Sequence, residues 1–175
     1  PAFPGRAVAL ACAGVLAALD GHGDQGLALV TEALDLARAD GRPIVLARAL
    51  LALHAVRRCR GDLAEADRAL RECLALLGTA ADPMDLAAVR HERARLAVLR
   101  GDLDDARALL DCCLSIHRDQ HGAPAVGRAA GGADPVPHEW THTAATLALL
   151  AGDLDGAERR WRDLLAAYRA QDAEP

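Results

Sequence analysis

Four near-copies of one short pattern, each beginning with Gly-Asp, organise this chain of 175 residues. They start at Gly23, Gly61, Gly101 and Gly152 and read GDQGLALVTEAL, GDLAEADRAL, GDLDDARALL and GDLDGAERRW. Each copy has an alanine five residues after its glycine, at Ala28, Ala66, Ala106 and Ala157. The starts lie 38, 40 and 51 residues apart. A period in this range with helical content is typical of stacked helical hairpins, which usually bind other molecules.

Each Gly-Asp pair predicts a tight turn between two helices. The glycine ends one helix in the left-handed conformation, and the aspartate caps the start of the next. The start and stop signals place first helices at about 5–20, 43–59, 83–99 and 136–150, and second helices at about 24–39, 62–77, 102–119 and 153–170. The alanine after each turn is expected to face the residue seven before the glycine, so that the two helices approach closely. These facing residues are Leu16, His54, Ala94 and Ala145.

Composition excludes several classes of function. The net charge is −5, and all 20 basic residues are arginines with no basic stripe, so direct nucleic-acid binding is not expected. No apolar stretch is long enough to span a membrane. Five cysteines, an odd number scattered through helical patterns, indicate a reducing cytoplasm. The chain starts at Pro1 without a methionine, and we therefore expect it to be a fragment of a larger protein.

The repeated G-D-x-x-x-A opening resembles that of the tetratricopeptide repeat, whose second helix typically begins in this way. The resemblance covers most of the chain, although the family's aromatic positions are mostly Leu or Ala here and the period exceeds the usual 34 or so residues. It implies an all-α fold, a right-handed α-α superhelix of about four helical hairpins and eight helices. Residues 1–175 would form a single domain, with repeats at about 5–40, 43–78, 83–120 and 136–171 and a loop at 121–137.

The links and turns, such as ALARADGRP, also resemble the tetratricopeptide regions of actinobacterial regulators of the MalT-like, LuxR-type and SARP-type classes. This resemblance implies a sensor or scaffold segment of a larger regulator. Our preferred hypothesis is a non-enzymatic, cofactor-free helical-repeat module that binds a protein segment or a small acidic ligand. An additional hypothesis is self-association of the chain through its repeat ends, because an open stack leaves apolar faces there.

In tetratricopeptide stacks the first helices line a concave groove, and the resemblance places three rows of residues there. They lie thirteen, ten and six residues before each glycine, and in the first repeat they are Leu10, Ala13 and Ala17. The N-terminal half of the groove is apolar, whereas the C-terminal half is polar. The candidate ligand-binding residues are Arg48, Leu51, His91, Arg95, Glu139, His142 and Thr146.

A rival hypothesis from another class rests on the sequence HEWTH, residues 138–142. On a helix, H-E-x-x-H places two imidazoles on one face to hold zinc while the glutamate activates a bound water. His117 and His121 form a second pair with the same spacing, so a zinc site of His117, His121, His138 and His142 is the alternative. Against a zinc enzyme, no third ligand follows the motif, and Glu139 suits a first helical turn electrostatically.

Overall fold

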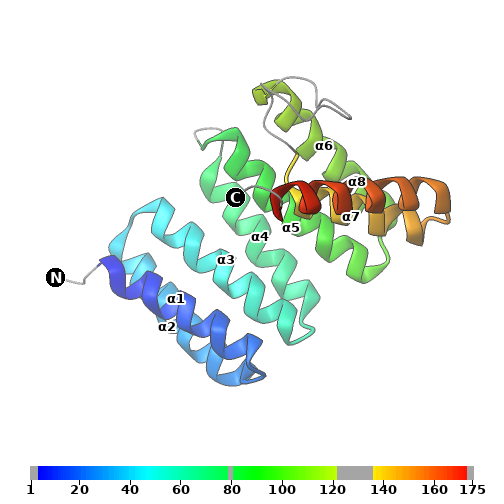
Figure 1. The fold of residues 1–175 in the computed structure, drawn as a ribbon. Helices are drawn as coiled ribbons and strands as arrows, with labels where there is room; N and C mark the ends of the chain where they lie inside the picture. Colours follow the sequence, from blue (N-terminus) through cyan, green and yellow to red (C-terminus); the bar gives the residue numbers. More distant parts are fainter. Residues whose placement is uncertain (1–3, 79–80, 122–135, 173–175) are drawn as a thin grey trace. The chain divides into compact units, whose positions relative to one another are not determined.

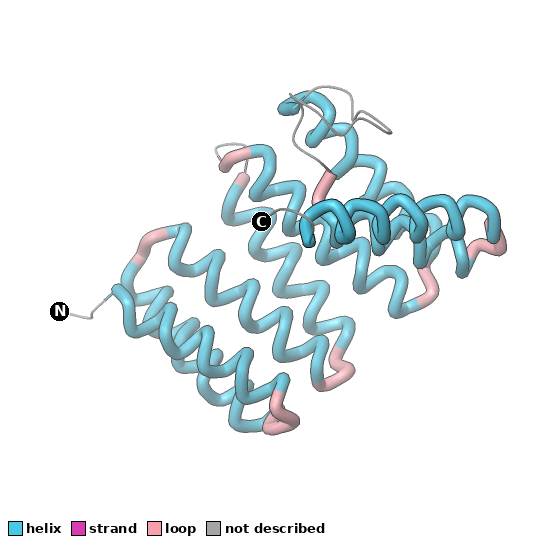
Figure 2. Tube along the Cα trace, viewed as in Figure 1, coloured by secondary structure: helices cyan, strands magenta, loops and turns pink. Residues whose placement is uncertain are grey.

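The computed structural model describes residues 4–78, 81–121 and 136–172. Within them the chain is helical and contains no strand (Figures 1 and 2). The helices are α1 (Pro4–Leu19), α2 (Gly23–Asp40), α3 (Pro43–Cys59), α4 (Leu63–Leu77), α5 (Pro83–Arg100), α6 (Leu103–His121), α7 (His138–Leu150) and α8 (Leu154–Asp172). The all-α prediction is confirmed, and the helix bounds agree with those expected to within a few residues. Most of the predicted loop at 121–137 lies outside the described residues.

The chain divides into two compact units, Pro1–Val89 and Arg90–Pro175. In the first unit α1 packs against α2 and α3, and α3 packs against α4 and α2. In the second unit α7 packs against α8 and α6. Ala97 of α5, Ala106 of α6 and Leu147 of α7 form one buried cluster there. Whether the two units unfold as a single domain stays a prediction.

Three of the predicted turn glycines, Gly61, Gly101 and Gly152, have positive φ of 81°, 82° and 81°. At the second turn the amide of Gly61 donates to the carbonyl of Arg58, and the amide of Asp62 donates to that of Arg57. This pair of bonds satisfies two of the carbonyls left open at a helix end and needs a left-handed residue, which glycine supplies without a Cβ clash. The left-handed turns are therefore confirmed.

The first turn lies two residues earlier than the sequence pattern indicated. Gly21, not Gly23, has positive φ, of 87°. The amide of Gly21 donates to Ala18 and that of His22 to Ala17, which is the same bonding as in the other turns. Gly23 is instead the first residue of α2. The expectation that Ala28 and Leu16 face each other in the hairpin is consequently wrong, since both are exposed, whereas the alanines of the other turns are buried. Counted from Gly21, the first three turn glycines are 40 residues apart.

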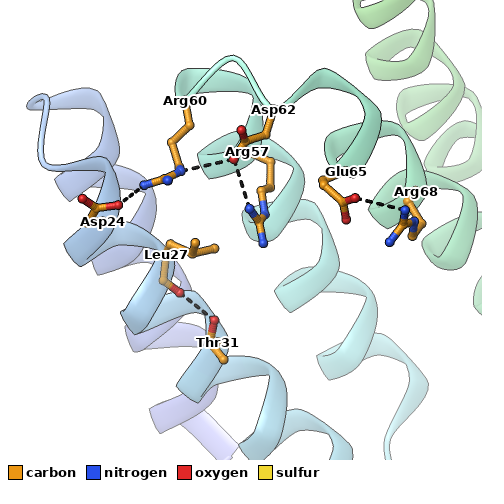
Figure 3. Close-up of polar contacts among 8 residues, drawn as sticks. All are labelled: Asp24, Leu27, Thr31, Arg57, Arg60, Asp62, Glu65 and Arg68. Atoms are coloured by element: carbon orange, nitrogen blue, oxygen red, sulfur yellow. Dashed lines mark hydrogen bonds and ion pairs between the residues drawn. The ribbon is translucent and has the colours of Figure 1, made fainter.

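Aspartate does not cap the second helix by its side chain at every turn. Asp153 does so, because its Oδ1 accepts the amide of Gly156 at 2.9 Å. The Asp62 side chain makes no such bond. Its Oδ2 instead accepts Arg57 Nη1 at 3.0 Å and Arg60 Nε at 3.2 Å (Figure 3). These hydrogen bonds, Arg57 first, lower the pKa of Asp62. Arg60 also joins the first two hairpins, since its Nη1 donates to Asp24 Oδ1 at the start of α2 (Figure 3).

In the first hairpin, two glycines take the small-residue positions of the turn motif. Gly26 lies five residues after Gly21 and Gly14 lies seven before it, and both are buried. A Cβ on Gly26 would stand 2.6 Å from the Gly14 carbonyl oxygen and 3.1 Å from the Ala18 Cβ. A Cβ on Gly14 would stand 2.5 Å from Val30 Cγ2. The backbones of α1 and α2 therefore approach closely because neither residue has a side chain.

We predict that Gly26→Ala destabilises the protein although alanine is the better helix former. The added methyl group meets backbone rather than a flexible side chain, and such overpacking costs about 1–3 kcal/mol. The free energy of unfolding from denaturant titration measures it. Gly5→Ala is the matched control, because nothing lies within 4 Å of a Cβ there, and it should be neutral or stabilising by up to about 1 kcal/mol. Equal stability of Gly26→Ala and the parent would contradict the close approach.

Candidate functional site

In the first unit, the two predicted ligand-binding residues, Arg48 and Leu51, combine an exposed guanidinium with an apolar side chain. Arg48 and Leu51 lie three residues apart on α3, so they share a face. Arg48 is exposed and Leu51 is half-buried. Within residues 4–78, no hydrogen bond or ion pair engages the Arg48 side chain. The structure thus presents an uncommitted positive charge beside apolar side chains.

The corrected first turn changes which α1 residues belong to this surface. Thirteen, ten and six residues before Gly21 stand Val8, Ala11 and Val15, in place of Leu10, Ala13 and Ala17. Val8 and Val15 are half-buried and Ala11 is buried. Val8 holds the repeat position of Arg48, and Ala11 holds that of Leu51. Because α1 packs against α3, we expect these residues to continue the apolar part of the surface that contains Arg48 and Leu51. We call Val8, Val15, Arg48 and Leu51 the first-helix surface.

In the second unit, His91 lies inside the helix packing, not on an open face. Its side chain is 1% exposed, and its Nε2 stands 2.9 Å from Thr143 Oγ1 of α7. Its ring centroid is also 5.8 Å from that of Trp140. The expectation that His91 offers its imidazole to a ligand beside His142 therefore does not match this structure. The burial of His91 could not be predicted from the local sequence, because it depends on Thr143 and Trp140, which follow His91 by about fifty residues.

The hydrogen bonds around Thr143 show which ring nitrogen of His91 carries a proton. The Thr143 hydroxyl donates its one proton to the carbonyl oxygen of Glu139 at 3.0 Å, so it can only accept from the imidazole. His91 Nε2 is therefore the protonated nitrogen that donates to Thr143. Burial, the largest influence, lowers the pKa of His91, and Arg95 lowers it further, while Glu92 and Glu139 act in the opposite direction. The imidazole is consequently neutral at pH 7.

The other four predicted residues of the second unit lie on α5 and α7 with more exposed side chains. Arg95 is half-buried and its Nη1 donates to Glu92 Oε1 at 2.9 Å, which neutralises part of its charge. Glu139 and His142 are exposed. Thr146 uses its hydroxyl to donate to the His142 carbonyl oxygen at 3.0 Å. Ligand binding by this set stays a prediction, and Arg95 is a weaker anchor for an anion than Arg48.

Both histidines of the HEWTH motif pack against aromatic rings of α8. The His138 ring centroid is 4.8 Å from that of Tyr168. The His142 ring meets Trp161 edge-on at 4.7 Å. Among the described residues, no three His, Cys, Asp or Glu side chains are grouped as a metal ion would require. A zinc site stays an alternative prediction.

The remaining members of the alternative zinc set lie on α6. The His117 side chain is buried, with its ring centroid 6.1 Å from that of Trp140. The side chain of His121 lies outside the described residues. Trp140 is thus a core residue of the second unit, whereas Trp161 is 36% exposed.

Two cysteines fill equivalent core positions. Cys73 and Cys113 each lie twelve residues after a turn glycine, and both are buried. Desolvation raises the pKa of Cys73 to about 11 and that of Cys113 to about 12. Both thiols are therefore protonated at neutral pH, and they serve packing instead of nucleophilic chemistry.

We predict that acid weakens the protein through His91. An unfolded histidine takes up its proton near pH 6.5, whereas the lowered pKa of His91 delays uptake in the folded state. The contribution of His91 is constant above that pH and declines as the pH falls below it, until the folded group also titrates. Denaturant unfolding at about pH 7.5 and about pH 5.5, on either side of that value, should show this loss, and His91→Leu should reduce it.

Leucine is chosen for this variant because Leu51 occupies the equivalent position of α3. His22→Gln is the control. It changes a histidine at an exposed site and should leave the acid-induced loss of stability as it is in the parent. A loss of the parent's size in His91→Leu would refute the assignment to His91.

In the part of the chain that the structure describes, no helix meets the length and hydropathy needed to cross a bilayer. No protein-family model and no curated protein matches the sequence.

Solved structures do match. A variant of a kinesin-light-chain-like protein from Podosopora anserina with nearly identical TPR-like repeats matches with a TM-score of 0.72 and 16% identity, over 98% of this chain and 78% of that one. A second structure from the same source has a TM-score of 0.64 and 13% identity, over 99% and 100% of the two chains. BtubC (BKLC) from P. vanneervenii has a TM-score of 0.70 and 17% identity, over 95% of this chain and 64% of that one. These likenesses show that the chain has a tetratricopeptide-like fold.

Proposed function

We propose that the chain is a non-enzymatic module that binds an extended protein segment on its first-helix surface. The segment would carry apolar side chains next to an acidic group. The single observation behind this proposal is Arg48, an exposed arginine without a partner among the described residues, on the same face of α3 as half-buried Leu51.

The chemistry of this surface favours an acidic apolar peptide over other ligands. Apolar side chains lose water on binding and supply most of the affinity. A guanidinium forms two parallel hydrogen bonds with a carboxylate, which adds direction and selectivity. Most other arginines in the first unit already have acidic partners: Arg6 binds Glu32, Arg57 and Arg60 bind Asp62, and Arg71 binds Asp67. Arg48 is therefore the group in this unit best placed to select an acidic ligand.

The experiment is a peptide array probed with the purified chain, followed by affinity measurements on an enriched peptide. We expect enrichment of sequences that combine Leu or Val with Asp or Glu. Arg48→Ala should lower the affinity for the enriched peptide about fivefold. This loss is equivalent to about 1 kcal/mol of binding free energy, as expected for a partly exposed charge pair. Added salt should weaken binding by the parent more than binding by the variant.

Arg68→Ala is the matched control. Arg68 is an exposed arginine on a second helix, α4, where it pairs with Glu65 at 3.0 Å (Figure 3). Its removal should leave peptide affinity unchanged. An equal loss for Arg68→Ala and Arg48→Ala, or an array without acidic apolar sequences, would overturn the proposal.

The proposed cellular role rests only on the resemblance of the repeat links to those of actinobacterial regulators. The module would act in the cytoplasm as the sensor or scaffold segment of a bacterial regulator, and a DNA-binding domain in the same gene would support this. The rival zinc hypothesis predicts one zinc ion per chain by elemental analysis, lost on His142→Ala.

A further inference from the structure

The last helix exposes a stripe of large apolar side chains. Leu154, Trp161, Leu165 and Tyr168 of α8 are 64%, 36%, 48% and 46% exposed. They follow one another at intervals of seven, four and three residues, so they share one side of the helix. We call these four residues the tail face.

The equivalent stripe is covered on the other second helices. The tail-face positions lie two, nine, thirteen and sixteen residues after the turn glycine. On α4 they are Leu63, Leu70, Leu74 and Leu77, and on α6 they are Leu103, Leu110, Leu114 and His117. All eight side chains are buried or half-buried. The exposure of the tail face is therefore a property of the last hairpin.

The first helix exposes a second stripe, which we call the head face. It consists of Ala9, Cys12 and Leu16 of α1, which lie twelve, nine and five residues before Gly21, and all three are exposed. Leu16 is 62% exposed, whereas the equivalent Val56, Leu96 and Leu147 are at most 5% exposed. From Ala7 to Leu19, α1 contains no charged or hydrogen-bonding side chain other than the Cys12 thiol. Such a helix is suited to burial on more than one side.

The two sets of positions already pack against each other within the protein. At the junction of α6 and α7, Leu103, a tail-type position, packs against the cluster of Ala97, Ala106 and Leu147, in which Leu147 is a head-type position. At the other end of the same junction, the ring centroid of His117, a tail-type position, lies 6.1 Å from that of Trp140, a head-type position. The tail face thus has the residue pattern that a head-type helix covers elsewhere in the chain.

We propose that a second copy of this chain covers the tail face with the head face of its own α1. In the same register as α6 and α7, Leu154 would meet Leu16 of the second copy, and Tyr168 would meet its Ala9. The contact is heterologous, because different surfaces of the two copies meet. A dimer leaves one head face and one tail face free, so association proceeds beyond a dimer, to a closed ring or an open series.

The experiment is sedimentation velocity on the full chain from about 1 µM to about 1 mM, the range expected for an interface of one helix on one helix face. A reductant is present because Cys12 lies in the head face. The average mass should start at the 18.3 kDa of one chain and rise with concentration beyond that of a dimer. Leu16→Arg and Leu154→Arg should each remain monomeric, and circular dichroism melts should show that both are folded.

Mixing the two variants tests the geometry. Leu16→Arg retains an intact tail face and Leu154→Arg an intact head face, so an equimolar mixture should form a dimer and nothing larger. Leu99→Arg is the matched control, a 57% exposed leucine outside both faces, and it should associate like the parent. The proposal is overturned if the parent stays monomeric, if either variant alone dimerises, or if Leu99→Arg abolishes association.

Discussion

The structure depends on the close approach of two antiparallel helices beside the turn of each hairpin. A left-handed glycine reverses the chain, and two backbone hydrogen bonds close each turn in the same way. A small residue five positions after the glycine then packs into the preceding helix. It is an alanine in three hairpins and Gly26 in the first. Because the turn and the small residue have a fixed spacing, the two helices of each hairpin approach at equivalent positions.

Much of the fold could be predicted because its determinants are local. Gly-Asp turns, prolines at helix starts and apolar periodicity specify the helices within a few residues. The register of the first hairpin was wrong because Gly23-Asp24 copies the turn pattern, while the true turn, Gly21-His22, lacks the aspartate. The 40-residue spacing from Gly21 to Gly61 and the two small residues Gly14 and Gly26 were the signals that could have corrected it.

The site could be predicted less well, since burial of a polar side chain is set by distant partners. His91 occupies a row where Leu51 stands in α3, yet it is buried through Thr143 and Trp140. The sequence predicted Arg95 and Arg48 alike as positively charged ligand-binding residues. The structure separates them, because Glu92 lies one turn from Arg95, whereas Arg48 has no acidic partner among residues 4–78. The repeat also explains the two apolar ends, which are junction positions that no other helix among the described residues covers.

The register of the repeat is tested most directly by two single-glycine variants whose free energies of unfolding are compared. Gly21 has φ of 87°, where a Cβ is disfavoured by about 1–2 kcal/mol, so Gly21→Ala should be destabilising by roughly that amount. Gly23 begins a helix, and a Cβ there would lie 3.0 Å from the flexible side chain of Arg60, so Gly23→Ala should be nearly neutral. A larger loss for Gly23→Ala than for Gly21→Ala would contradict the 40-residue repeat and the surfaces derived from it.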